Sequence, residues 1–211
     1  IKYNKTQIYR RDRQNLNCER HFKVFNKFEV IPEYCFNCYK VQIIPKNIIE
    51  LIKLYFLFNK RIFKDNNFRK CMVETRPDIK GNYKGYIYCK DLKEAEEIIK
   101  LIKNKISKNN IDTKSIEIKH GCSEYYKKYP EFKDINYFGK QKIEYNRDWK
   151  KFEEIIDNQK IKREEKDEKF FGTTLNKLNI SDLLVINNWL AYSKSIEDAS
   201  LKEIFDREIY T

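Results

Sequence analysis

The sequence predicts an α+β protein organised around a ferredoxin-like βαββαβ unit at residues 34–122. Three observations predict this class: strand-like segments that end at prolines, two segments with apolar residues at helical spacing, and a last segment that alternates in character. Strand, helix, hairpin, helix and strand in this order form the split βαβ arrangement. Right-handed crossovers then place both helices on one face of a four-stranded antiparallel sheet with strand order 4-1-3-2.

The first half of this unit is a strand, a helix and a second strand. Residues 38–45 alternate in character and end at a proline, as short strands do. Residues 46–59 follow, with apolar side chains that recur at helical spacing. Residues 69–77 give the second strand pattern, which a proline again ends.

The second half is a hairpin strand, a helix and a closing strand. Gly81-Asn82 supplies the turn residues before a strand at residues 84–89. Asp91 stands where an N-cap residue belongs, and Glu94 follows three residues later, which is a capping-box arrangement at the start of a helix. Residues 115–120 alternate in character and complete the unit as the fourth strand.

Segments on both sides of this domain complete the chain. We interpret residues 1–33 as an N-terminal extension, in which residues 22–31 are expected to form a β-hairpin around Asn26-Lys27. We interpret residues 123–211 as a mainly helical C-terminal region that packs on the central domain. A helix capped by Asn179 is apolar on nearly every side, so we expect it to be well buried.

The positive charge of the chain is concentrated in its first part. The whole chain carries a net charge of +12, with 44 basic and 32 acidic residues. Residues 1–122 hold 27 basic and 14 acidic residues, whereas residues 123–211 hold 17 and 18. This asymmetry favours a polyanionic partner for the first part, nucleic acid before a membrane surface. The alternative is a basic but merely solvated surface in a lysine-rich composition.

Nothing in the sequence indicates a membrane protein. No run of about 18 apolar residues is present, which a spanning helix would need. The first residues carry neither the apolar stretch nor the cleavage site of a signal peptide. We therefore expect a soluble, intracellular (cytoplasmic) protein without a membrane partner, and the missing initiator methionine indicates trimming or a piece of a longer chain.

The cysteines are the sharpest chemical feature. In the predicted topology the start of the first strand lies beside the ends of the third and fourth strands, which brings Cys35, Cys38, Cys89 and Cys122 to one place. Four thiolates at such a place suit a tetrahedral Zn²⁺ site or, less favourably, an iron–sulfur cluster. Cys71 is a fifth candidate nearby. Buried reduced thiols and a redox or disulfide pair are the two alternatives, and free cysteines are often core residues.

A second spacing of this kind occurs in the N-terminal extension. Cys18 and His21 are separated by two residues, which suits a pair of metal ligands. The alternative interpretation of the pair is two surface residues without metal.

The third predicted strand has the sequence Lys84-Gly-Tyr-Ile-Tyr-Cys89. It is similar to the first six positions of the RNP1 motif of RNA-recognition-motif domains, and it lies on the strand where that family carries the motif. The resemblance implies that Tyr86 and Tyr88 stack on bases at the open face of the sheet. Ile87 stands where the family has Gly or Ala, and no RNP2 motif accompanies it.

Basic residues near these tyrosines complete the predicted nucleic-acid surface. Four of them are expected to meet phosphates: Lys40, Arg76, Lys84 and Lys119. The alternative is that both tyrosines pack beneath the N-terminal extension or the C-terminal helices.

Catalytic motifs are almost absent from the sequence. It contains no P-loop, GxGxxG, GxSxG or HExxH pattern, and only two histidines. His120 and Cys122 share a side of an extended strand end and form the one candidate nucleophile pair. We therefore expect a non-enzymatic module that binds nucleic acid, RNA before DNA, with the four-cysteine metal site as a brace. The alternatives are a structural protein that contacts protein partners in a larger assembly, and a thiol- or cluster-dependent enzyme.

Overall fold

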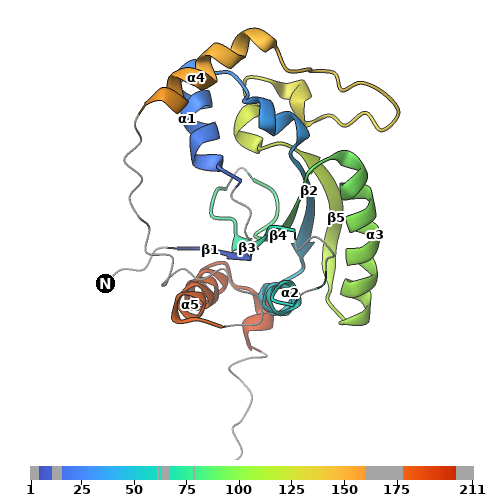
Figure 1. Cartoon of the computed structure of the whole chain (residues 1–211). Coiled ribbons are helices and arrows are strands. Elements are labelled where there is room, and N and C mark those ends of the chain that lie inside the picture. Colours follow the sequence, from blue (N-terminus) through green and yellow to red (C-terminus); the bar gives the residue numbers. More distant parts are fainter. Residues whose placement is uncertain are drawn as a thin grey trace, which may run out of the picture.

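The computed structural model describes residues 5–10, 16–60, 62, 67–77, 79–159 and 178–202. These residues form a mixed α+β structure with one antiparallel five-stranded sheet and five α-helices (Figure 1). The strands are β1 (Gln7–Arg10), β2 (Tyr39–Pro45), β3 (Arg69–Val73), β4 (Tyr83–Cys89) and β5 (Thr113–His120). The α-helices are α1 (Cys18–Phe28), α2 (Ile48–Phe58), α3 (Leu92–Lys108), α4 (Lys150–Asn158) and α5 (Ile180–Ser195).

Short 3-10 helices connect several of these elements. They are η1 (Glu33–Asn37), η2 (Ser123–Tyr125), η3 (Pro130–Lys133), η4 (Arg147–Trp149) and η5 (Ala199–Leu201). The two turns η1 and η2 lie at the amino end of β2 and the carboxyl end of β5, so they belong to the same end of the sheet.

The sheet has the strand order β1-β3-β4-β2-β5, and all four neighbouring pairs are antiparallel. The sequence predicts four strands, and the fifth comes from the N-terminal extension: β1 pairs with the outer edge of β3, with Ile8 opposite Cys71. Pairing this edge satisfies backbone groups that β3 would otherwise expose. The expected four-stranded sheet is therefore too small by one strand.

Local signals place the central helices where the sequence predicts them. The Asp91 side chain accepts a hydrogen bond from the Glu94 backbone at 2.7 Å and starts α3. At α5, Asn179 and Asp182 cap each other's backbone N–H groups in a complete capping box. These side-chain bonds depend only on neighbouring residues, so the sequence carries enough information to predict them.

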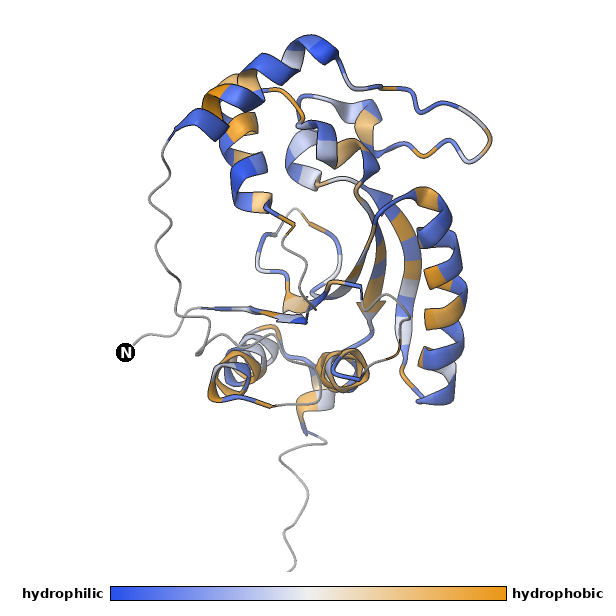
Figure 2. Ribbon diagram, viewed as in Figure 1, coloured by the Kyte–Doolittle hydropathy of each residue, from blue (hydrophilic) through white to orange (hydrophobic). Residues whose placement is uncertain are grey.

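One hydrophobic core joins the sheet to α2, α3 and α5 (Figure 2). Val41, Ile43 and Ile87 point into it from neighbouring strands and are fully buried. Side chains alternate across a strand, so the residues between them point to the opposite side of the sheet. The parity predicted for Ile87 on one side, with Tyr86 and Tyr88 on the other, is therefore confirmed.

A buried ion pair ties the first strand to the last long helix. The Arg10 guanidinium donates to the Asp182 carboxylate at 2.7 Å and to the Tyr55 hydroxyl at 2.8 Å. The Trp189 indole adds a hydrogen bond to the Thr6 carbonyl at 2.7 Å. The N-terminal extension is thus part of the packed structure and holds α5 against α2.

The predicted hairpin at residues 22–31 is wrong, because most of this segment belongs to helix α1. His21 and Val24 lie on its buried side, and their spacing of three residues is helical. The helix packs against α4, and Phe28 contacts Phe152 with ring centroids 4.9 Å apart. The phenylalanines of this segment fit either structure in isolation, and packing against a helix more than 120 residues away selects the helix.

The expectation that the helix after Asn179 is well buried is also wrong in part. Helix α5 buries Val185 and Trp189, whereas Ile180 and Leu183 remain 76% and 51% exposed. The C-terminal region, which the sequence predicts as mainly helical, contains α4 and α5, whereas residues 160–177 and the chain after residue 202 lie outside the described residues. Among the helices that are described, none combines the length and apolar character needed to cross a membrane.

Candidate nucleic-acid interface

The side of the sheet opposite α2 and α3 borders a cavity of about 640 Å³, which we call the sheet-face pocket. Its floor comes from all five strands, and its far wall comes from the start of α1 and from η2. The carboxylates of Glu74 and Glu124 line it together with ten aromatic or basic side chains: Tyr9, Phe22, Phe68, Tyr86, Tyr88, Tyr126, Lys40, Lys70, Arg76 and Lys119. Tyr86 and Tyr88 are half-buried and line this cavity, and they do not pack beneath the C-terminal helices. The alternative that the N-terminal extension covers them holds in part, because Tyr9 and Phe22 of that extension line the same cavity.

Strand register places lysines directly beside tyrosines in this pocket. Lys40 pairs with Tyr88 across β2 and β4, and its Nζ atom lies 5.2 Å from the centre of the tyrosine ring. Lys70 pairs with Tyr86 on one side and Tyr9 on the other, with its Nζ atom 5.3 and 5.7 Å from the ring centres. These distances allow cation–π attraction, which holds the ammonium groups over the rings.

The Lys70 ammonium has no carboxylate partner among the described residues; its nearest polar contact is the Gln7 side chain at 3.4 Å. Burial, and secondarily the charge of Lys40, lower the pKa of Lys70 to about 8. A buried cation with a depressed pKa is stabilised by any anion that enters the pocket. This lysine therefore gives the pocket a preference for negatively charged ligands.

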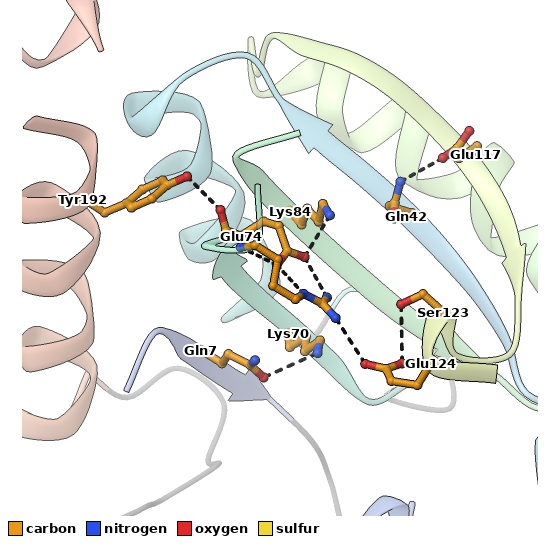
Figure 3. A network of polar contacts seen from close by, with 10 residues as sticks. Gln7, Gln42, Lys70, Glu74, Lys84, Glu117, Ser123, Glu124 and Tyr192 are labelled. Atoms are coloured by element: carbon orange, nitrogen blue, oxygen red, sulfur yellow. Dashed lines mark hydrogen bonds and ion pairs between the residues drawn. The ribbon is translucent and has the colours of Figure 1, made fainter. Parts of the chain in front are cut away.

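Two other basic residues of the predicted surface are neutralised by Glu74 (Figure 3). The Glu74 carboxylate accepts from Arg76 Nε at 2.8 Å and from Lys84 Nζ at 3.0 Å. Burial alone raises the Glu74 pKa, but hydrogen bonds from both cations lower it to about 2. Lys84 is only 1% exposed and does not line the pocket. Its predicted role in phosphate binding therefore has no geometric basis, and Arg76 reaches the pocket only as half of an ion pair.

The predicted residues thus divide into two groups. Lys40, Tyr86, Tyr88 and Lys119 line the pocket, while Lys84 belongs to the ion-pair network at its edge. Sequence reasoning missed Lys70, although its place between inward-facing residues on a predicted strand was a signal that could have found it. Tyr9 and Phe22 carried no such signal, because their position depends on long-range pairing and packing.

The four predicted metal ligands do not gather at one place. Cys35, Cys38 and Cys122 line a small cavity of about 10 Å³ at the end of the sheet, together with Cys18 and His21. Cys89 points into the core shared with α2 and α3, so it lies on the other side of the sheet. In the described part of the chain, no three His, Cys, Asp or Glu side chains stand in a geometry that holds a metal ion. All six cysteines are free thiols, and burial raises the pKa of Cys38 to about 11.

The candidate nucleophile pair is not assembled either. Both ring nitrogens of His120 contact backbone carbonyls, with Nδ1 2.7 Å from the Phe132 oxygen and Nε2 2.8 Å from the Phe36 oxygen. The Cys122 sulfur instead accepts a hydrogen bond from Lys40 Nζ at 2.9 Å. His120 therefore packs as a structural residue and has no free nitrogen to act as a base for the thiol.

Comparisons with known proteins add no second line of evidence. No protein-family model, no curated protein and no solved structure matches this chain. The indications of function are therefore the geometry of the sheet-face pocket and the RNP1-like sequence of β4.

Proposed function

We propose that the protein is a binding module for single-stranded nucleic acid, RNA before DNA, and not an enzyme. The sheet-face pocket receives a nucleotide whose base stacks on tyrosine and whose phosphate meets lysine. The module is built on a ferredoxin-like fold, and the order β3-β4-β2-β5 with α2 and α3 between the strands supports this assignment.

The observation that carries the proposal is the pair of cross-strand lysine–tyrosine contacts inside a concave site. A tyrosine ring offers a flat surface to any base, and such stacking contributes about 1–3 kcal/mol per base. The Nζ atoms of Lys40 and Lys70 lie 5.2 and 5.3 Å from the ring centres of Tyr88 and Tyr86. One nucleotide can therefore place its base on a tyrosine ring and its phosphate near the neighbouring ammonium group. The ligand that fits this combination is aromatic and anionic.

The shape of the site favours single strands over duplexes. The volume of about 640 Å³ lies within the range of about 300–1,000 Å³ found for sites that enclose small ligands. A duplex keeps its bases stacked inside and offers no free base face to a pocket of this kind. The preference for RNA rests on the resemblance of the β4 sequence to RNP1.

The test is fluorescence anisotropy with short labelled single strands of RNA, the matching DNA, and an RNA duplex. We expect single-stranded RNA to bind most tightly. The affinity should fall with salt with a logarithmic slope of about −2, which corresponds to three phosphate contacts by Lys40, Lys70 and Lys119.

Matched variants locate the binding site. Tyr86→Leu removes the stacking ring and should weaken binding by about 10-fold or more. Lys103→Met removes an exposed lysine from α3, on the other side of the sheet, and should leave binding unchanged. Equal affinity of both variants, or binding that ignores salt, would refute the proposal.

A second candidate function rests on the exposed side of α5. Ile180, Leu183 and Leu184 are 76%, 51% and 41% exposed, together with Leu178 just before the helix. Clustered apolar side chains of this kind favour a protein partner, as in an assembly protein. In that case Leu183→Glu should abolish self-association or partner binding without changing the affinity for nucleic acid, as measured by light scattering and anisotropy on the same sample.

A further inference from the structure

The small cavity at the end of the sheet, which we call the cysteine cavity, lies where three segments meet. The first turn of α1, the η1 turn and the residues after β5 surround it. Five side chains with metal-binding chemistry line it: Cys18, His21, Cys35, Cys38 and Cys122. The cavity has a volume of about 10 Å³, which is close to the space that a single small ion or water molecule needs.

Two of these pairs have the spacing of zinc ligands. Cys18 and His21 lie one turn apart on the same side of α1, and Cys35 and Cys38 have the same spacing, with Cys35 inside η1 and Cys38 at its carboxyl end. The Cys38 backbone N–H donates to the Cys35 carbonyl at 3.2 Å, which folds the second pair into a tight turn. Thirteen residues separate His21 from Cys35, so the whole pattern is C-x2-H-x13-C-x2-C. Two short pairs separated by 12–20 residues are typical of structural zinc sites.

His21 supplies an independent observation. The residue is only 6% exposed, and its Nε2 atom has no hydrogen-bond partner in the structure. Its ring stacks on Tyr34, with ring centroids 5.2 Å apart, so the plane of the imidazole is fixed. Buried polar atoms of native proteins almost always have a partner, and one without a partner in a cavity lined by thiols calls for a ligand there.

We propose that Cys18, His21, Cys35 and Cys38 bind one Zn²⁺ as a structural Cys3His site in the cysteine cavity. As the side chains of the described residues stand, they do not form a metal-holding group, so binding requires the four donors to move closer together. Three thiolates and a neutral imidazole match the donor set of closed, tetrahedral zinc sites.

The position of the remaining cysteines separates this site from the one that the sequence predicts. Cys89 belongs to the core on the other side of the sheet and does not line the cysteine cavity. Cys122 lines it, but its sulfur is already engaged by the Lys40 ammonium at 2.9 Å. The two ligands that replace these cysteines, Cys18 and His21, come from α1, whose helical structure brings both to the cavity.

The site goes beyond the proposed nucleic-acid function and explains how one wall of the sheet-face pocket is held. Cys18 and Phe22 of α1 line both cavities, so a metal bridge from α1 to the start of β2 fixes the wall opposite Tyr88. Metal content is measured on the protein alone. A failure of nucleic-acid binding therefore leaves this inference intact, and the reverse also holds.

The first experiment is native mass spectrometry and elemental analysis of the full chain purified under reducing conditions. We expect one zinc ion per chain, which Cys18→Ser loses and Cys89→Ala retains. A metal-free wild-type protein that also fails to take up Zn²⁺ or Co²⁺ would overturn the proposal. Zinc retained in Cys18→Ser but lost in Cys89→Ala would restore the ligand set predicted from the sequence and overturn this one.

A ligand exchange avoids the ambiguity of variants that fail to fold. In His21→Cys the fourth donor becomes a thiolate, so the Co²⁺-substituted variant should keep one metal per chain. Its thiolate-to-cobalt absorption should grow by about one third relative to the wild type, because four thiolates replace three. An identical Co²⁺ spectrum for both proteins would show that His21 is not a ligand and would overturn the assignment.

Discussion

Replacing Lys70 by methionine should make the protein more stable and at the same time a weaker binder of nucleic acid. The Lys70 ammonium is half-buried between Tyr9 and Tyr86 without an ion-pair partner among the described residues, and desolvation lowers its pKa from 10.5 to about 8. Each unit of pKa corresponds to about 1.4 kcal/mol, so the charge costs at most about 3.5 kcal/mol at neutral pH, and solvent that reaches the half-buried ammonium lowers this cost. Two cation–π contacts return about 0.5–1 kcal/mol each. We therefore expect Lys70→Met to raise the free energy of unfolding by about 1–2 kcal/mol.

The pH dependence of this effect has a defined sign. The lowered pKa means that folding is penalised wherever the folded state must carry the charge, which is below about pH 8. Above pH 8 the folded state releases the proton, and the penalty disappears as the pH approaches the unfolded value of 10.5. The difference in unfolding free energy between Lys70→Met and the wild type should therefore be constant below pH 8 and shrink above it.

Urea unfolding at pH 7 and pH 9.5, with anisotropy on the same preparations, measures both effects. Lys103→Met is the matched control, because it makes the same change on the exposed side of α3 and should shift stability by no more than about 0.5 kcal/mol. A Lys70→Met variant that is less stable than the wild type would refute the reasoning. Unchanged affinity for single-stranded RNA would show that Lys70 does not serve the ligand.

Three further substitutions test other parts of the structure. Glu74→Gln removes the carboxylate that neutralises Lys84 and should cost about 3 kcal/mol at pH 7 in urea unfolding. In the wild type the stability that ionised Glu74 contributes is lost as the pH falls from 4.5 towards about 2, so Glu74→Gln should lose less stability over this range. A variant that loses as much stability as the wild type would contradict this prediction. Gly85→Ala places a Cβ atom 2.5 Å from Leu54 and should lower stability by about 1–3 kcal/mol, an effect that Leu54→Ala in the same chain should partly relieve. Asp182→Ala strands the Arg10 guanidinium and should cost about 3–5 kcal/mol, with a melting temperature near that of the wild type as the contrary result.

Much of the central fold can be predicted from residues that are close together in the sequence. The Asp91 and Asn179 caps act within four residues, and the side that each strand residue faces follows from alternation. Tyr86 and Tyr88 were therefore placed on the correct side of the sheet. The RNP1 motif does not explain why Gly85 must lack a side chain. The structure does, because Leu54 of α2 packs against the Gly85 backbone.

The missed features all depend on contacts between distant segments. Residues 22–31 are compatible with a strand or a helix by propensity, and contact with α4 decides for the helix. The helical structure of this segment also places Cys18 and His21 together at the cysteine cavity. The β-hairpin predicted for residues 22–31 does not suggest this position. The neutralisation of Lys84 depends on Glu74 reaching it across the β3–β4 turn, a pairing that charge counting along the chain does not reveal.

The Arg10–Asp182 pair also affects the order in which the chain can fold while it is being synthesised. Arg10 is 1% exposed, and the partner that balances its charge is 172 residues further along. Until α5, which carries Asp182, leaves the ribosome, docking of β1 would bury the Arg10 cation without a carboxylate to balance its charge. During that time the outer edge of β3 is exposed and can pair with strands of other chains. Stable docking of β1 on β3 should therefore follow the emergence and packing of α5, which makes this strand pairing a late step of folding.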